Sequence, residues 1–279
     1  MGFRAKIAFW AWVTGLLAVS ATGRAETNAA SAFLADAQEF FAKYRQASQQ
    51  LQRGKLQEAA ITMDLLSRSV GGSPWIEIAL LKRCQLIEPD NDQGAEEDYN
   101  LLRKRLANAP YFQGDTERAR LFGVALQGAV DAGITRIRIR RVRAALQKYH
   151  AQYLGYPESL LKLSILGYIE MQDIHDAKEE RIRYVPEAPE VSPFITYRRF
   201  ELQSETPIDP FVPTSPRLES VSQISEQPPR FSALVRFPGR AEPTRLETDQ
   251  TVQGFYVAAV APGGAVLAST TRLLVLLTP

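Results

Sequence analysis

The first part of the chain places apolar side chains at helical spacing, and polar or glycine-containing breaks divide it into segments. Residues 30–52 form one such segment, 55–70 a second, 75–87 a third and 95–110 a fourth. The breaks are Arg53-Gly54-Lys55, Gly71-Gly72 followed by Pro74, and the polar turn over residues 89–94, whose aspartates are expected to cap the next helix. The pattern predicts two antiparallel helical hairpins over residues 30–112.

A longer helical pattern follows, over residues 115–153, with an apolar stripe that includes Val142, Leu146 and Tyr149 and an expected interruption at Gly133. We expect this helix to end at Gly155-Tyr156-Pro157, because glycine adopts the left-handed closing conformation and proline prevents the helix from resuming. The apolar run over residues 160–169 should pack nearby, with the tyrosine rings covering the base of a small sheet.

The pattern becomes β-like after Pro157. Residues 181–185 and 194–202 favour short strands, and residues 204–230, with six prolines in 27 positions, are typical of a linker. Residues 231–279 contain four or five short strands and predict a small β-sandwich or barrel. The expected fold is therefore an α+β multidomain chain, with a helix and small-sheet region over residues 115–203.

The N-terminal 25 residues have the layout of a secretory signal peptide. Arg4 and Lys6 precede an apolar run from Ile7 to Ala21, and Gly23-Arg24-Ala25 fits a cleavage site before Glu26. The run has about 15 residues, against the roughly 20 that a membrane-spanning helix prefers, so cleavage is favoured over an uncleaved anchor. Either reading predicts a periplasmic or secreted protein, associated with the membrane at most through this segment.

Composition and motifs assign no catalytic residue, no cofactor and no metal. The net charge is +2, which gives no reason to expect nucleic-acid binding. The two histidines, His150 and His175, lack a second metal ligand at suitable spacing, the acidic turn lacks the ligands of a calcium loop, and the single cysteine, Cys84, is expected to be a small buried apolar side chain.

An arginine-rich segment within the long helix has two interpretations. Arg136, Arg138, Arg140, Arg141 and Arg143 form either a solvated helix face, which is favoured, or a patch for anionic lipid or an acidic partner.

Residues 54–60, "GKLQEAA", resemble the turn and second-helix start of a tetratricopeptide repeat. In that repeat an alanine, here Ala59, lies where two helices pack closely, and Pro74 and Pro110 are 36 residues apart, near the repeat length. An ordinary helical bundle remains the alternative, since any helical hairpin needs a small residue at its contact.

The region from about residue 136 to 211 resembles the head of type II secretion pseudopilins and type IV pilins. The matching positions are Ala145, Leu146, Tyr149, Gly155, Tyr156, Pro157, Leu160, Leu163, Gly167 and Tyr168, followed by the Asp209-Pro210-Phe211 triplet. The chain lacks that family's N-terminal stem: the fifth residue counted from Phe3 is Ile7 rather than glutamate. The resemblance therefore implies a pilin-like head on a protein that does not polymerise as a pilin.

The C-terminal part resembles the small periplasmic β-domain of inner-membrane clamp proteins of the same machines. The positions that carry this resemblance are Asp249, Val252, Gly254, Val257, Val260, Val266, Leu267 and Leu273. Any small β-barrel has a similar alternation of apolar and polar residues. This resemblance is therefore less specific than the resemblance to the pilin head.

These resemblances imply a non-enzymatic periplasmic accessory or scaffold protein of a type II secretion or type IV pilus-like system. Its partners would be proteins of the bacterial envelope, through surfaces that the sequence does not identify. The alternatives are a secreted or envelope ligand-binding protein unrelated to secretion, and a hydrolase whose site has no recognisable motif.

Overall fold

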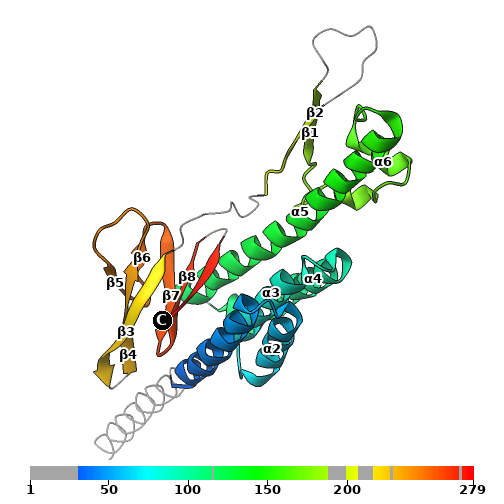
Figure 1. The fold of residues 1–279 in the computed structure, drawn as a ribbon. Coiled ribbons are helices and arrows are strands. Elements are labelled where there is room, and N and C mark those ends of the chain that lie inside the picture. The colour runs from blue at the N-terminus through cyan, green and yellow to red at the C-terminus, as the bar shows by residue number, and fades with distance from the viewer. Residues whose placement is uncertain (1–30, 115, 188–198, 207–215, 227–228, 270–271) are drawn as a thin grey trace, which may run out of the picture.

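The computed structural model describes residues 31–114, 116–187, 199–206, 216–226, 229–269 and 272–279 (Figure 1). The predicted signal peptide lies outside these ranges, as does the Asp209-Pro210-Phe211 triplet. No helix within the described ranges combines the length and apolar character that crossing a membrane requires. The chain is mixed α and β, as the sequence predicts.

The N-terminal part is helical, and its helices are separated near the predicted breaks. Residues 31–52 are helical, and α2 (Leu56–Ser69), α3 (Trp75–Ile87) and α4 (Asp92–Asn108) follow, with the short 3-10 helix η1 (Pro110–Gln113) after them. Helix α4 begins earlier than predicted because the Asn91 side chain accepts a hydrogen bond from the Gly94 N–H at 2.9 Å. The expectation that aspartates cap this helix was wrong.

Helix α5 (Glu117–Tyr153) is one continuous helix of 37 residues, so the expected interruption at Gly133 was wrong. Gly133 instead lets α4 approach closely, because a Cβ there would lie 2.4 Å from the Tyr99 ring. At the C-terminal end, Leu154 rather than Gly155 adopts the left-handed conformation, with φ of 56°. The helix extends to Tyr153, so the closing position falls on the next residue.

The end of α5 carries a small head made of α6 (Leu160–Ile165), the 3-10 helix η2 (Met171–Ile174) and an antiparallel pair, β1 (Arg183–Glu187) and β2 (Arg199–Gln203). These strands overlap the two segments predicted as strands, residues 181–185 and 194–202, and extend past them by two residues and one residue. One hydrophobic cluster joins the head to α5, and it comprises Ile139, Val142, Ala145, Leu146, Tyr149, Leu160, Leu163, Ile174 and Ile182. Figure 1 shows the head at one end of the molecule.

Two further antiparallel sheets form the C-terminal part. One has the order β3 (Arg217–Glu226), β4 (Pro229–Arg236) and β5 (Thr244–Glu247). The other has the order β6 (Thr251–Val252), β7 (Phe255–Ala261), β8 (Gly264–Ala268) and β9 (Leu273–Leu277). They share a cluster that includes Val235, Leu246, Val257 and Leu267, so they pack face to face and no closed barrel forms.

Strand β3 falls inside the range predicted as a linker, so that prediction was wrong for residues 217–226. The prolines of this range misled the prediction, because β3 begins directly after Pro216 and contains no proline itself.

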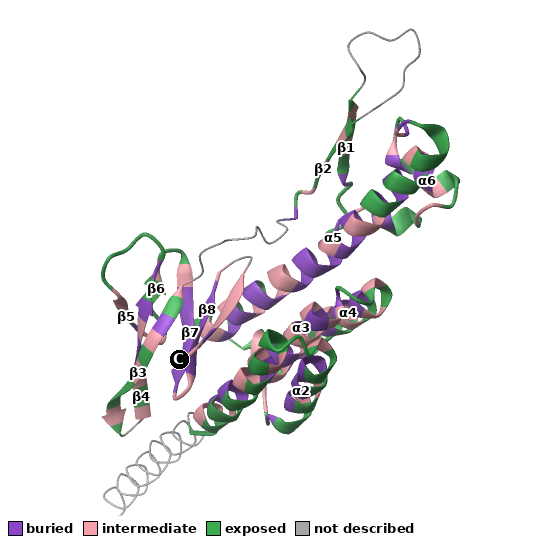
Figure 2. Ribbon diagram, viewed as in Figure 1, coloured by how far each residue is buried: buried purple, intermediate pink, exposed green. Residues whose placement is uncertain are grey.

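The sheet β6–β9 packs with its second face against the helices, where Tyr256, Ala258 and Val266 join the same core as Phe41, Trp75 and Phe122. Figure 2 shows buried residues on β7, on β8 and along α5. The Arg45 guanidinium also donates to the Thr278 carbonyl at 3.0 Å, and Arg118 pairs with Asp249 at 2.6 Å. The C-terminal part therefore completes the main core, whereas the linker predicted before it had implied a separate small domain.

Candidate functional site: a cleft between α4, α5 and residues 167–173

The arginine-rich segment of α5 faces carboxylates of the neighbouring elements. At the C-terminal end of α3, Glu88 binds Arg136 at 3.0 Å and Arg140 at 2.8 Å. On α4, Glu96 binds Arg138 Nε at 3.0 Å and Arg141 Nη1 at 2.5 Å.

Arg141 extends this network into the head. It lies 3.2 Å from Asp173 of η2, so one guanidinium links α4, α5 and the segment after α6. Burial tends to lower the pKa of Arg141, but the carboxylates of Glu96 and Asp173 outweigh this and raise it. Glu88, Glu96 and Asp173 are all buried, so these ions lie in a partly dehydrated environment where pairing is required.

The favoured interpretation of this segment, a solvated helix face, was therefore wrong for four of the five arginines; Arg143 is exposed. The four paired arginines do not form a free patch for lipid either, because their partners belong to this chain.

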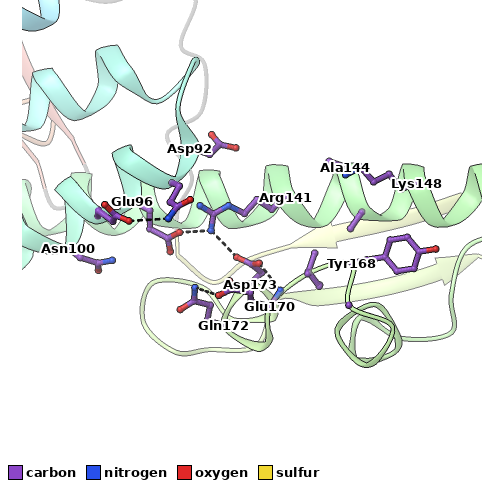
Figure 3. A pocket seen from close by; sticks show the side chains of 15 residues that line it. Asp92, Glu96, Asn100, Arg141, Ala144, Lys148, Tyr168, Glu170, Gln172 and Asp173 are labelled. Atoms are coloured by element: carbon purple, nitrogen blue, oxygen red, sulfur yellow. Dashed lines mark hydrogen bonds and ion pairs between the residues drawn. The ribbon is translucent and has the colours of Figure 1, made fainter.

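A cleft opens beside this network, between α4, α5 and residues 167–173 (Figure 3). Its volume is about 810 Å³. Five carboxylates and two cationic side chains line it, an excess of three negative charges; they are Asp92, Glu96, Glu97, Glu170, Asp173, Arg141 and Lys148. Glu96 and Asp173 share Arg141, Glu96 also pairs with Arg138, and Asp92 lies 3.4 Å from Arg140. Among the described residues, Glu97 and Glu170 are the lining carboxylates that form no ion pair. The cleft is thus suited to cationic rather than anionic groups.

Asp176 accepts hydrogen bonds that hold residues 176–180 against Thr206. Its Oδ1 accepts hydrogen bonds from the N–H groups of Lys178 and Glu180 at 2.8 and 3.0 Å, and its Oδ2 accepts from the Thr206 N–H at 3.1 Å and hydroxyl at 2.5 Å. Burial tends to raise the pKa of Asp176, but these hydrogen bonds outweigh it and lower the pKa. The residue connects the head to the chain leaving β2.

The residues singled out in the sequence do not come together. The His150 ring packs on Tyr156 with centroids 4.7 Å apart, while His175 Nδ1 lies 3.3 Å from the Met171 carbonyl oxygen. Cys84 is 1 % exposed, and burial raises the pKa of its thiol to about 12. Among the described residues, no group of three potential metal ligands is found.

Sequence reasoning missed the buried carboxylates Glu88, Glu96, Asp173 and Asp176. Glu88 is the C-cap residue of the apolar helix α3, and Glu96 follows the buried Ala95 in α4. An acidic residue at a position that otherwise faces the core was the sequence signal that could have identified these carboxylates.

No protein-family model, no curated protein and no solved structure matches this chain.

Proposed function

We propose that the chain is an exported, non-enzymatic scaffold of a type II secretion or type IV pilus-like system, and that it binds envelope proteins through its head. One observation carries the proposal: the head exposes apolar side chains around the junction of α5 and α6. Leu154 is 77 % exposed, Ile165 75 % and Met171 53 %. Tyr153, Leu161 and Leu166 are also exposed there. Several large apolar side chains exposed within one small part of a molecule are typical of protein contact sites.

The head is held rigidly, which favours a docking role. The Tyr184 hydroxyl donates to the Pro157 carbonyl at 2.7 Å, and the Tyr156 and Phe200 rings meet edge to face at 4.8 Å. The link from Arg141 to Asp173 fixes the other side of the head. A preorganised surface loses less conformational entropy on binding.

The position of the head also favours a protein partner over the membrane. The first described helical turn, at residue 31, lies at the opposite end of the molecule from α6 (Figure 1). An N-terminal segment held in the membrane would therefore leave the head distant from the lipid.

The resemblances support the same assignment. The sequence from Tyr149 to Tyr168 is similar to a pilin head, the helical hairpins are similar to tetratricopeptide repeats, and the C-terminal strands are similar to clamp-protein β-domains. All three kinds of module act through protein contacts, and envelope machines are where the first and third occur together.

Co-purification from membranes in mild detergent tests the proposal. The native protein should enrich components of a secretion or pilus machine, and its N-terminus should begin near Glu26. The double variant Leu154→Asn, Ile165→Gln should lose that enrichment; asparagine tolerates the left-handed conformation of position 154. The matched control Leu65→Gln, Leu101→Gln alters side chains that are 59 % and 63 % exposed on α2 and α4, and it should retain the enrichment. Equal loss in both variants would refute the role of the head.

A second candidate is an envelope protein that binds a cationic ligand, favoured by the acidic rim of the cleft. It predicts that a lysine-rich peptide binds with an affinity that falls in Glu97→Gln, Glu170→Gln and at high salt. Unchanged binding in that variant would exclude the cleft as the ligand site.

A further inference from the structure

Strand β9 (Leu273–Leu277) is the last strand of its sheet and pairs with β8 on one side. Its register with β8 pairs Gly264 with Leu277 and Ala268 with Leu273, without a shift between them. The flanking hydrogen bonds, from Ser269 N–H to the Arg272 carbonyl and from Thr278 N–H to the Gly263 carbonyl, establish which residues bond across the pair.

The alternation of an antiparallel ladder then assigns each residue of β9 to one side. Leu274 and Leu276 bond to β8, whereas Leu273, Val275 and Leu277 direct their N–H and C=O groups away from the sheet. Within the described residues, no hydrogen bond engages these outward groups.

The other edges of the two C-terminal sheets, β3, β5 and β6, are short, charged or interrupted by bulges. Strand β3 has two register shifts, β5 is four residues long and carries Arg245 and Glu247, and β6 has only two residues. By contrast, β9 has five apolar residues with no charge, proline or bulge, and four of the five are partly exposed. Such an edge is a template for another strand.

The sequence of β9 identifies which strand fits. Residues 273–277 read Leu-Leu-Val-Leu-Leu, which is the same in both directions about Val275. A two-fold axis at Val275 would pair Leu273 with Leu277, Leu274 with Leu276 and Val275 with itself. A two-fold interface requires this self-complementarity.

The outward N–H and C=O groups of β9 are also self-complementary about Val275. A two-fold axis through Val275 uses that residue's outward N–H and C=O, and the neighbouring outward groups at 273 and 277 then pair with each other. Arg272 would lie opposite Thr278 of the second copy, so no like charges meet. We infer that β9 pairs antiparallel with β9 of a second copy of this chain, joining two four-stranded sheets into one continuous sheet. This inference does not depend on the proposed function.

Amide hydrogen exchange, resolved by residue, tests the pairing on the purified native protein. Sedimentation velocity should show a dimer that dissociates on dilution. In the dimer the amides of Leu273, Val275 and Leu277 should be protected, and they should lose protection on dilution, while those of Leu274 and Leu276 remain protected by β8. A protein that sediments as a monomer at every concentration would overturn the inference.

The variant Val275→Pro removes one outward donor without touching the ladder to β8, since edge strands tolerate proline on the outward side. It should raise the dimer dissociation constant about tenfold or more, because it loses at least one net hydrogen bond and its two-fold copy. Val275→Thr keeps the N–H and the β-branched shape and should leave the constant unchanged.

Three outcomes would contradict self-pairing. They are a dimer whose Leu273, Val275 and Leu277 amides exchange rapidly, a dimer that persists unchanged in a folded Val275→Pro variant, and protection of these amides only after another envelope protein is added. If Val275→Pro fails to fold, the exchange pattern of the native protein decides.

Discussion

The ring of Tyr99 on α4 occupies the space where a side chain at position 133 of α5 would begin: a Cβ on Gly133 would lie 2.4 Å from Tyr99 Cζ. The same tyrosine donates from its hydroxyl to Glu88 Oε2 at 3.0 Å. The glycine thus determines how closely α4 and α5 approach and keeps Tyr99 in reach of the network around Glu88.

Gly133→Ala should therefore destabilise the protein although alanine favours helix. Overpacking costs about 1–3 kcal/mol, against about 1 kcal/mol gained from helix propensity. Gly123→Ala is the matched control in the same helix, because its Cβ would meet Phe112 at an ordinary 3.4 Å. Chemical denaturation of both variants checks this, and a Gly133→Ala protein as stable as Gly123→Ala would contradict it.

Glu96→Ala should lower the free energy of unfolding by about 3–5 kcal/mol, the usual cost of removing one partner of a buried ion pair. The change leaves the guanidinium groups of Arg138 and Arg141 without the carboxylate they share. The control is Arg120→Ala, which breaks the exposed pair with Glu117 and should have no measurable effect. Urea titrations provide the comparison; similar midpoints for the two variants would show that the network contributes little.

Asp176→Asn should destabilise the head by about 1–3 kcal/mol at neutral pH, because an amide nitrogen cannot accept one set of the hydrogen bonds that Asp176 accepts. The pKa of Asp176 is lowered by folding, so its contribution to stability is present above the ordinary aspartate pKa of about 3.9 and is lost as the pH falls through the folded value. The difference between wild type and variant should therefore shrink below about pH 4. Thermal melts at a series of pH values measure it, and a constant difference down to pH 2 would argue against a charged Asp176.

Cys84 should resist thiol reagents in the folded protein at pH 8. Its thiol is buried and its pKa is raised to about 12, so little thiolate is present and access is blocked. Ellman's reagent should give no fast reaction until denaturant is added, when one thiol per chain should react. Rapid labelling under native conditions would place Cys84 at an accessible surface.

Removal of residues 231–279 should prevent correct folding, since it uncovers the core around Phe41, Trp75 and Phe122. The truncated chain should aggregate or be degraded by limited proteolysis under conditions in which the full chain is stable. A soluble monomer with unchanged helical circular dichroism would instead show that residues 231–279 are not needed for the helical part to fold.

The same contact can be probed in the full chain with Gly264→Ala. A Cβ there would lie 2.5 Å from both the Phe41 ring and the Leu276 carbonyl oxygen, so the variant should melt at a lower temperature. An unchanged melting temperature would mean that the sheet and the helix of residues 31–52 adapt to each other without cost.

Many of the local elements could be predicted from the sequence alone. Helix α3 begins and ends at the predicted residues, and β1 and β2 overlap the predicted segments, because helical periodicity, strand propensity and chain breakers act over a few neighbouring residues. The apolar stripe through Val142, Leu146 and Tyr149 likewise faces the head as its spacing indicates.

Only the tertiary structure decided what each polar residue and each glycine does. Arg138 looks like part of an exposed basic face until Glu96, 42 residues earlier, is placed beside it. Gly133 resembles a helix break until Tyr99 fills its open side, and residues 231–279 resemble a separate small β-domain behind a linker until Gly264 meets Phe41. Ion pairing, close packing and shared cores depend on residues distant in the chain, and a single sequence carries no distance between them.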